Sequence, residues 1–121
     1  MGEQISITMQ DGFELGAYHS TPSGQSKGVV VVIQEIFGVN GHIREVVEGY
    51  AERGYQAIAP ALFDRIEPDL QLGYTEADMG KGIELAFQGL EMAQTMKDLQ
   101  SVVDHAAAQG AVGVVGYCFG G

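Results

Sequence analysis

Cysteine, positive charge and long apolar segments are all scarce in this sequence. A single cysteine, Cys118, excludes a disulfide within the chain and any metal site built from several cysteines. Six lysines and arginines accompany sixteen acidic residues, and the formal net charge of −10 repels the phosphates of nucleic acids. The longest apolar run, at 29–33, is too short to cross a bilayer, and the first residues do not resemble a signal peptide. These absences predict a cytoplasmic protein that binds neither nucleic acid nor membrane.

The remaining composition is that of a globular domain, with 45% hydrophobic and 18% charged residues. Apolar and polar residues alternate over 5–9 and again over 13–17, on either side of a polar turn at 10–12. This pattern predicts a β-hairpin with one solvent-exposed face. The sequence contains no internal repeat and no interdomain linker, which predicts a single domain.

Three further strands are predicted from short apolar segments. The β-branched run at 29–33 is typical of a strand buried on both faces of a parallel sheet, and 112–115 is predicted to be another buried strand. The segment at 55–60 is predicted to be a short strand. Apolar residues at helical spacing predict one helix over 43–51 and a long helical pattern over 75–108. Strands and helices therefore alternate. This order predicts a mostly parallel sheet with helices on both faces and an antiparallel edge from the hairpin.

The long helical pattern has a predicted interruption and a predicted buried face. Gly89 marks the interruption, and Gly110 ends the pattern. His105 is expected to contact solvent. The residues expected on the buried face of the last part are Met92, Met96, Leu99, Val103 and Ala106.

The segment Gly116-Tyr117-Cys118-Phe119-Gly120-Gly121 directly follows a predicted buried strand. It has the form of a nucleophile elbow, G-x-nucleophile-x-G, with cysteine in the position of serine. The glycines allow a sharp turn from strand to helix, which places the side chain at the N-terminus of the next helix. There the helix dipole and free N–H groups favour an anion and lower the pKa of a thiol. Since a thiolate is a strong nucleophile, Cys118 is the candidate nucleophile.

The glycine-rich segment around Cys118 has two other interpretations. On the motif alone, Cys118 could equally be a buried structural residue in a glycine-rich strand end. A dinucleotide-binding fingerprint, G-x-G-x-x-G, would need glycine at the position of Cys118, and the sequence has no G-x-x-x-x-G-K-[ST] motif. We therefore predict no nucleotide, no organic cofactor and no metal.

A second segment, residues 34–40, follows the apolar run at 29–33. In the α/β-hydrolase plan, two backbone N–H groups form the oxyanion hole. One belongs to the residue after the nucleophile, and the other to the loop between the third strand and the next helix. If the hairpin supplies the first two strands, the candidate donors are the N–H groups of Phe119 and Ile36.

Several motifs together resemble the dienelactone hydrolase (carboxymethylenebutenolidase) family from about residue 29 to the end. The resemblance implies the N-terminal part of an α/β-hydrolase fold and cleavage of a small ester or lactone through an acyl-enzyme on Cys118. It also implies that Glu35 is the carboxylate that meets the thiol in the resting site. The motifs are Gln34-Glu35-Ile36-Phe37-Gly38-Val39-Asn40, Ile43-Arg44, Tyr55, Pro60-Ala61-Leu62-Phe63-Asp64-Arg65 and the elbow itself.

Taken alone, a glutamate after a buried strand is usually the first solvated residue. In this motif, a carboxylate near the thiol would disfavour the thiolate by like-charge repulsion or accept a hydrogen bond from S–H. We therefore expect Glu35 to keep Cys118 neutral until substrate moves the carboxylate aside.

The acid and the histidine of a catalytic triad are missing from these 121 residues. All three histidines precede Cys118, whereas the α/β-hydrolase order is nucleophile, acid, histidine. The sequence therefore predicts one partial α/β-hydrolase domain over residues 1–121, ending at the nucleophile elbow. The expected partners are a small ester or lactone and the remaining C-terminal part of the domain, in the same or a second chain. Without that part, the strand at 112–115 should be an uncovered edge.

Two alternative functions remain open. One is a truncated or split half-domain without activity of its own. The other is a redox-responsive thiol protein, which the lack of a second, resolving cysteine disfavours.

Overall fold

The computed structural model describes residues 2–116, in which five strands form one sheet in the order β1-β2-β4-β3-β5. The strands are β1 (Gly2–Thr8), β2 (Glu14–Ser20), β3 (Val29–Ile33), β4 (Gln56–Pro60) and β5 (Val112–Gly116). The hairpin strands β1 and β2 are antiparallel, and β2 is antiparallel to β4. The other three are parallel, since β3 pairs with β4 on one side and with β5 on the other. The hairpin, the antiparallel edge and the three parallel neighbours were all predicted, and all are confirmed.

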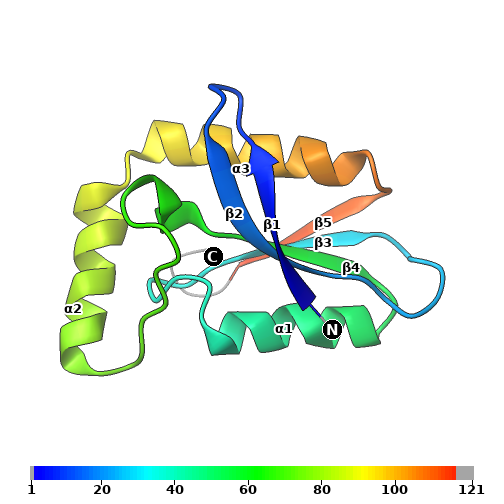
Figure 1. The fold of residues 1–121 in the computed structure, drawn as a ribbon, viewed down its shortest axis with the longest axis horizontal. Helices are drawn as coiled ribbons and strands as arrows, with labels where there is room; N and C mark the ends of the chain where they lie inside the picture. Colours follow the sequence, from blue (N-terminus) through cyan, green and yellow to red (C-terminus); the bar gives the residue numbers. More distant parts are fainter. Residues whose placement is uncertain (1, 117–121) are drawn as a thin grey trace.

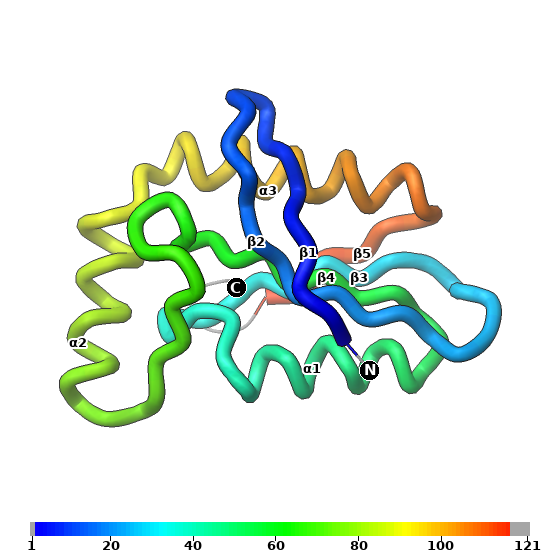
Figure 2. Tube along the Cα trace, in the orientation of Figure 1, coloured from blue at the N-terminus to red at the C-terminus, as the bar shows by residue number. Residues whose placement is uncertain are grey.

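Helices cover both faces of this sheet. In Figure 1, α1 (Gly41–Glu52) and α3 (Met92–Ala107) lie on opposite sides of the strands. The short helix α2 (Glu76–Glu84) stands beside the sheet at the end where β3 and β4 finish, as the trace in Figure 2 also shows. The remaining helical turns are the 3-10 turn η1 (Leu62–Arg65) and the π-helical turn η2 (Leu85–Gly89).

Local signals in the sequence explain where the helices begin and end. The side chain of Asn40 accepts a hydrogen bond from the N–H of Ile43 and caps α1, and Thr75 caps α2 in the same way. Gly54, with φ of 98°, takes the left-handed conformation that follows α1. After η2, Leu90 is extended, so the interruption predicted near Gly89 is confirmed.

The sheet separates two apolar cores. The β-branched run explains this arrangement, because Val31 packs into the core beneath α3 while Val32 packs into the core beneath α1, and both are 0% exposed. At the other end of the sheet order, β5 is an edge strand within residues 2–116, and Val114 is 55% exposed. The edge position predicted for this strand is confirmed.

The predicted buried face of α3 is wrong in its first half. Met92 and Met96 are 66% and 57% exposed, whereas Asp98 is only 2% exposed. Helical periodicity of apolar residues missed this face because an ion pair with Arg65 brings a charged residue inward. The buried residues of α3 are Thr95, Asp98, Ser101, Val102 and Ala106.

None of the helices within residues 2–116 has the length and the apolar character needed to span a membrane.

Candidate active site

The candidate site lies where the parallel strands β3 and β5 end side by side. Their register pairs Ile33 with Gly116. In open α/β sheets, ligands bind at the carboxyl ends of the strands, where side chains from neighbouring loops meet. The loop at 34–40 leaves β3 at this end. The predicted site residues Cys118 and Phe119 follow β5 in sequence and lie outside the described residues.

Gln34 fixes the start of this loop from inside the protein. Its side chain is 0% exposed, and its Oε1 accepts a hydrogen bond of 2.9 Å from the backbone N–H of Leu62. Its Nε2 donates a hydrogen bond of 3.1 Å to the carbonyl oxygen of Glu35. A buried amide that satisfies both of its polar ends ties the loop after β3 to the turn after β4. In the sequence, Gln34 was only one residue of the motif at 34–40, and nothing there indicated that its side chain holds the loop.

The loop turns sharply at Gly38. Its N–H donates a hydrogen bond of 3.3 Å to the carbonyl of Glu35, and its φ is 78°. A Cβ at this position would lie 2.4 Å from the carbonyl oxygen of Leu70. Only glycine accepts both the left-handed conformation and this close approach.

A small apolar cluster holds the tip of the loop in place. Ile36, the predicted oxyanion donor, is 9% exposed. No residue within 2–116 accepts a hydrogen bond from its backbone N–H. Buried backbone N–H groups are rarely unpaired, so this donor calls for an acceptor from outside residues 2–116. The cluster consists of Ile36, Phe37, Phe63, Leu72 and Ala86.

Glu35 does not behave as a freely solvated residue. It is partly buried, and its Oε1 is buried without a hydrogen-bond partner among residues 2–116. Leaving a carboxylate oxygen buried and unpaired is unfavourable, which calls for a partner that donates a hydrogen bond or carries positive charge. The solvated alternative considered from sequence is therefore disfavoured, and the structure places Glu35 next to Ile36 in one well-packed loop.

Asn40 closes the far end of the loop. It is 5% exposed, and in addition to capping α1 its Nδ2 donates to the carbonyl of Leu72 and to the hydroxyl of Tyr74, both at 3.2 Å. The ring of Tyr74 stacks edge-on against Phe37, with centroids 4.5 Å apart. The segment around residues 70–74 therefore covers the loop and keeps it ordered.

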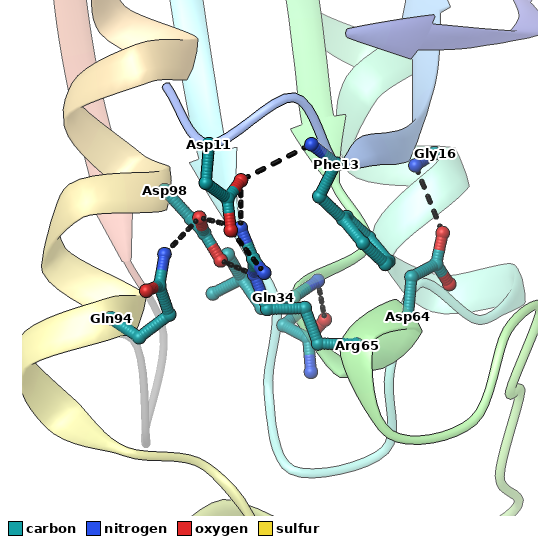
Figure 3. Close-up of polar contacts among 9 residues, drawn as sticks. Asp11, Phe13, Gly16, Gln34, Asp64, Arg65, Gln94 and Asp98 are labelled. Atoms are coloured by element: carbon teal, nitrogen blue, oxygen red, sulfur yellow. Dashed lines mark hydrogen bonds and ion pairs between the residues drawn. The ribbon is translucent and has the colours of Figure 1, made fainter. Parts of the chain in front are cut away.

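Arg65, Asp98 and Asp11 form a second polar cluster, centred on η1. Figure 3 shows the guanidinium of Arg65 between the two carboxylates. Its Nε lies 2.7 Å from Asp98 Oδ2, and its Nη2 lies 2.9 Å from Asp11 Oδ1. The guanidinium carbon also lies 4.5 Å from the ring centroid of Phe13. The cluster joins the hairpin turn, η1 and α3.

The charges in this cluster stabilise one another. The hydrogen bond from Arg65 and that from the N–H of Phe13 lower the pKa of Asp11 to about 2. The hydrogen bonds to Asp98 and Asp11 raise the pKa of Arg65 above its usual value. Because Arg65 is committed to these two carboxylates, we interpret it as a structural residue. The sequence contained Arg65 in a family motif but gave no sign of its partners.

The histidines form no catalytic arrangement with this loop within the described residues. His42 and His105 are exposed, as predicted for His105, and His19 Nε2 lies 3.2 Å from Gln56 Oε1. Residues 2–116 also contain no group of three or more histidine, cysteine, aspartate or glutamate side chains that could hold a metal ion.

Comparison with known proteins identifies similar sequences along the whole chain. The model of the dienelactone hydrolase family matches residues 15–121. A carboxymethylenebutenolidase from Pseudomonas putida is 36% identical over 98% of this chain, and 52% of its own length is matched. A carboxymethylenebutenolidase homologue from Synechocystis is 44% identical over 77% of this chain and 39% of its own length.

Solved structures agree with the sequence comparison. A dienelactone hydrolase homologue from Klebsiella pneumoniae superposes with a TM-score of 0.79 at 32% identity, over 99% of this chain and 50% of that protein. More distant neighbours include an α/β serine hydrolase homologue from Coxiella burnetii, with a TM-score of 0.60 at 19% identity. The expected α/β-hydrolase fold is thus confirmed, and the chain spans about half the length of the proteins it matches.

Proposed function

Because the chain belongs to the dienelactone hydrolase family, we propose that it carries the nucleophile of a hydrolase that cleaves small esters or lactones through Cys118. The observation that carries this proposal is the register of β3 and β5. Ile33 pairs with Gly116, so Glu35 and Cys118 each follow a paired position by two residues. The family match also extends through residue 121 and includes the whole elbow motif.

The proposed reaction proceeds through a thioester. The sulfur of Cys118 attacks the carbonyl carbon, and a C–S bond forms as the carbonyl oxygen becomes an oxyanion. The N–H groups of Ile36 and Phe119 stabilise this oxyanion, a contribution typically worth about 3 kcal/mol per donor. Collapse restores the C=O bond and breaks the C–O bond, and the proton that left the thiol is transferred to the leaving oxygen, so that an alcohol is released. Water then hydrolyses the thioester to the carboxylic acid and returns the proton to the thiol. No step needs a metal or an organic cofactor.

The proposed role of Glu35 is to control the thiol before substrate binds. Its buried Oε1 has no hydrogen-bond donor among residues 2–116, and the S–H group of Cys118 is the donor we propose for it. A neutral thiol held in this way is a weak nucleophile and resists oxidation. Displacement of the carboxylate by substrate would free the thiol for attack.

We expect Glu35→Gln to increase the rate at which iodoacetamide alkylates Cys118 at neutral pH. The substitution removes a negative charge that disfavours the thiolate and keeps the size of the side chain. The rate is measured by mass spectrometry, as the growth with time of the alkylated form of the peptide that contains Cys118. Glu45→Gln is the matched control, since Glu45 is exposed on α1 and carries the same charge. An unchanged or slower rate in Glu35→Gln would contradict the proposed role.

We also propose that the remaining C-terminal part of the domain, in the same or a second polypeptide, covers the outer edge of β5. The exposed Val114 at this edge supports the proposal, because an uncovered apolar edge strand tends to pair with another chain. That part would supply the triad acid and the histidine.

Residues 1–121 expressed alone are therefore expected to self-associate and to show no esterase activity. Size-exclusion chromatography and an aryl-ester assay measure both properties. Addition of a separately produced C-terminal part, taken from a full-length relative, should restore solubility and hydrolysis. A monomeric 1–121 fragment that hydrolyses esters through Cys118 would contradict this proposal.

A further inference from the structure

The helix α2 lies against the loop that carries Ile36. Gly82 is the buried residue of this helix. A Cβ at Gly82 would lie 2.2 Å from the carbonyl oxygen of Ile36 and 3.1 Å from its carbonyl carbon. These distances are far below van der Waals contact, so α2 lies against the backbone of the loop and not only against its side chains. The sequence showed Gly82 merely as a glycine within a helical pattern.

The two glycines inside α2 differ in this contact. Gly80 precedes Gly82 by two residues and faces another side of the helix, and a Cβ there would meet no atom within 4 Å. The next inward-facing position, one turn beyond Gly82, is Ala86 in η2, which packs in the same cluster as Ile36. Gly82 and Ala86, four positions apart, therefore lie on the same face and contact the loop. A backbone can approach a helix closely only where the side chains are this small.

The outer side of α2 is consistent with this orientation. Met79 and Ile83 are each 44% exposed, so the helix does not bury its larger apolar residues against the loop. Its N-terminus is capped by Thr75, and Asp78 accepts a hydrogen bond of 2.8 Å from the N–H of Gly73. Further along the helix, Lys81 Nζ lies 3.1 Å from Glu67 Oε1. This ion pair links α2 to the segment after η1 without involving Gly82.

Ile36 is consequently restrained from two sides. On its N-terminal side, the carbonyl of Glu35 accepts hydrogen bonds from Gln34 and from the N–H of Gly38. On its C-terminal side, its own carbonyl lies against Gly82. The N–H of Ile36 shares one planar peptide unit with the carbonyl of Glu35, and it is joined to the carbonyl of Ile36 through the Cα. A shift of either carbonyl therefore changes the direction of this N–H.

We propose that Gly82 is a positioning residue for the oxyanion hole. By allowing α2 to lie against the carbonyl of Ile36, it fixes the direction in which the Ile36 N–H points. The inference rests on the proposed function, because it concerns the donor that stabilises the oxyanion in that reaction. Oxyanion donors are effective only when they are held in place before the charge develops.

The test compares Gly82→Ala with Gly80→Ala in the complete protein that contains this chain. Both substitutions replace a helical glycine by alanine and raise helix propensity equally. Only Gly82→Ala adds a methyl group in contact with the loop. We expect it to lower kcat for a small aryl ester by about 10²-fold, the scale of a misplaced catalytic group, with KM nearly unchanged. Gly80→Ala should match the wild type in both constants.

Two further measurements separate positioning from general damage to the structure. An aryl trifluoromethyl ketone forms a tetrahedral adduct with a thiol and needs the oxyanion hole, so Gly82→Ala should weaken its inhibition in proportion to the loss of kcat/KM. Alkylation of Cys118 by iodoacetamide develops no oxyanion, and its rate should not change. If Gly82→Ala does not fold, Thr75→Ala loosens α2 without added bulk and should lower kcat severalfold, again with unchanged alkylation.

Each outcome bears on the inference. Equal kcat and equal ketone inhibition in Gly82→Ala and Gly80→Ala would overturn it, while wild-type hydrolysis would leave the proposed function standing. Parallel losses of hydrolysis and of alkylation in Gly82→Ala would also overturn it, because they would indicate a general structural role. A wild-type protein that cleaves no ester would contradict the proposed function itself, and the inference with it.

Discussion

Replacement of Cys118 by alanine is expected to lower kcat for a small aryl ester by about 10³-fold or more, the usual consequence of removing the nucleophile of a catalytic unit. Alanine removes the sulfur and adds no bulk. We therefore expect the thermal unfolding midpoint to remain close to that of the wild type. Initial rates measured with and without the substitution, together with calorimetry, check both expectations.

The control for this experiment is chemical. Prior alkylation of the wild-type protein with iodoacetamide should produce the same loss of activity, once peptide mapping shows that the modification lies on Cys118, the single cysteine of these 121 residues. Hydrolysis that survives in Cys118→Ala would show that another group attacks the ester or that a base activates water directly.

The second large effect concerns the cluster of Arg65, Asp98 and Asp11. Asp98 is 2% exposed, and Arg65 supplies its compensating positive charge at 2.7 Å. Arg65→Met keeps an apolar side chain of similar length but leaves the Asp98 carboxylate buried and uncompensated. Breaking a buried ion pair in this way typically costs about 3 to 5 kcal/mol, and we expect the free energy of unfolding to fall by about that amount. Urea denaturation measures it.

The double variant Arg65→Met/Asp98→Leu tests the reason for that loss. Replacing both charges by apolar groups of similar size removes the buried carboxylate, and much of the stability should return. If the double variant is no more stable than Arg65→Met, the loss comes from packing of the Arg65 side chain and not from the buried charge.

Asp11 provides a matched comparison on the exposed side of the cluster. Its carboxylate is 50% exposed, so Asp11→Asn should destabilise the protein far less than Arg65→Met. The hydrogen bonds from Arg65 and from the N–H of Phe13 lower the pKa of Asp11 from 3.8 to about 2. Because the pKa of Asp11 is lowered in the folded protein, its ionised carboxylate adds to the free energy of unfolding above about pH 4. This stabilisation is lost as the pH falls from about 4 to about 2. Asp11→Asn should remove that part of the acid sensitivity, which acid titrations of unfolding would detect.

The sheet could be predicted from the sequence because each strand has a local pattern of apolar residues. The run at 29–33 is buried on both faces, and the alternating segments at 5–9 and 13–17 form the hairpin. The buried face of α3 could not be predicted in the same way, since Asp98 turns inward to meet Arg65, a residue distant in sequence. Periodicity assigns apolar residues to the core and has no means to detect such a pair.

The candidate site was only partly predictable for a related reason. Glu35 and Ile36 were found from a motif, and the structure places them in one buried loop. The supports of that loop, Gln34 and Gly82, act through contacts between segments that are far apart in the chain. The roles assigned to Cys118 and Phe119 stay predictions, because both residues lie outside 2–116.

The proposed acyl-enzyme on Cys118 is the central claim, and mass spectrometry of the quenched reaction tests it most directly. The complete protein is mixed with an aryl acetate, quenched in acid within the first turnovers, and digested for peptide mapping. The account predicts one acetyl group on the peptide that contains Cys118, absent from the Cys118→Ala variant and prevented by prior alkylation. Continuous hydrolysis with no acetyl group on Cys118, or with the group on another residue, would contradict it.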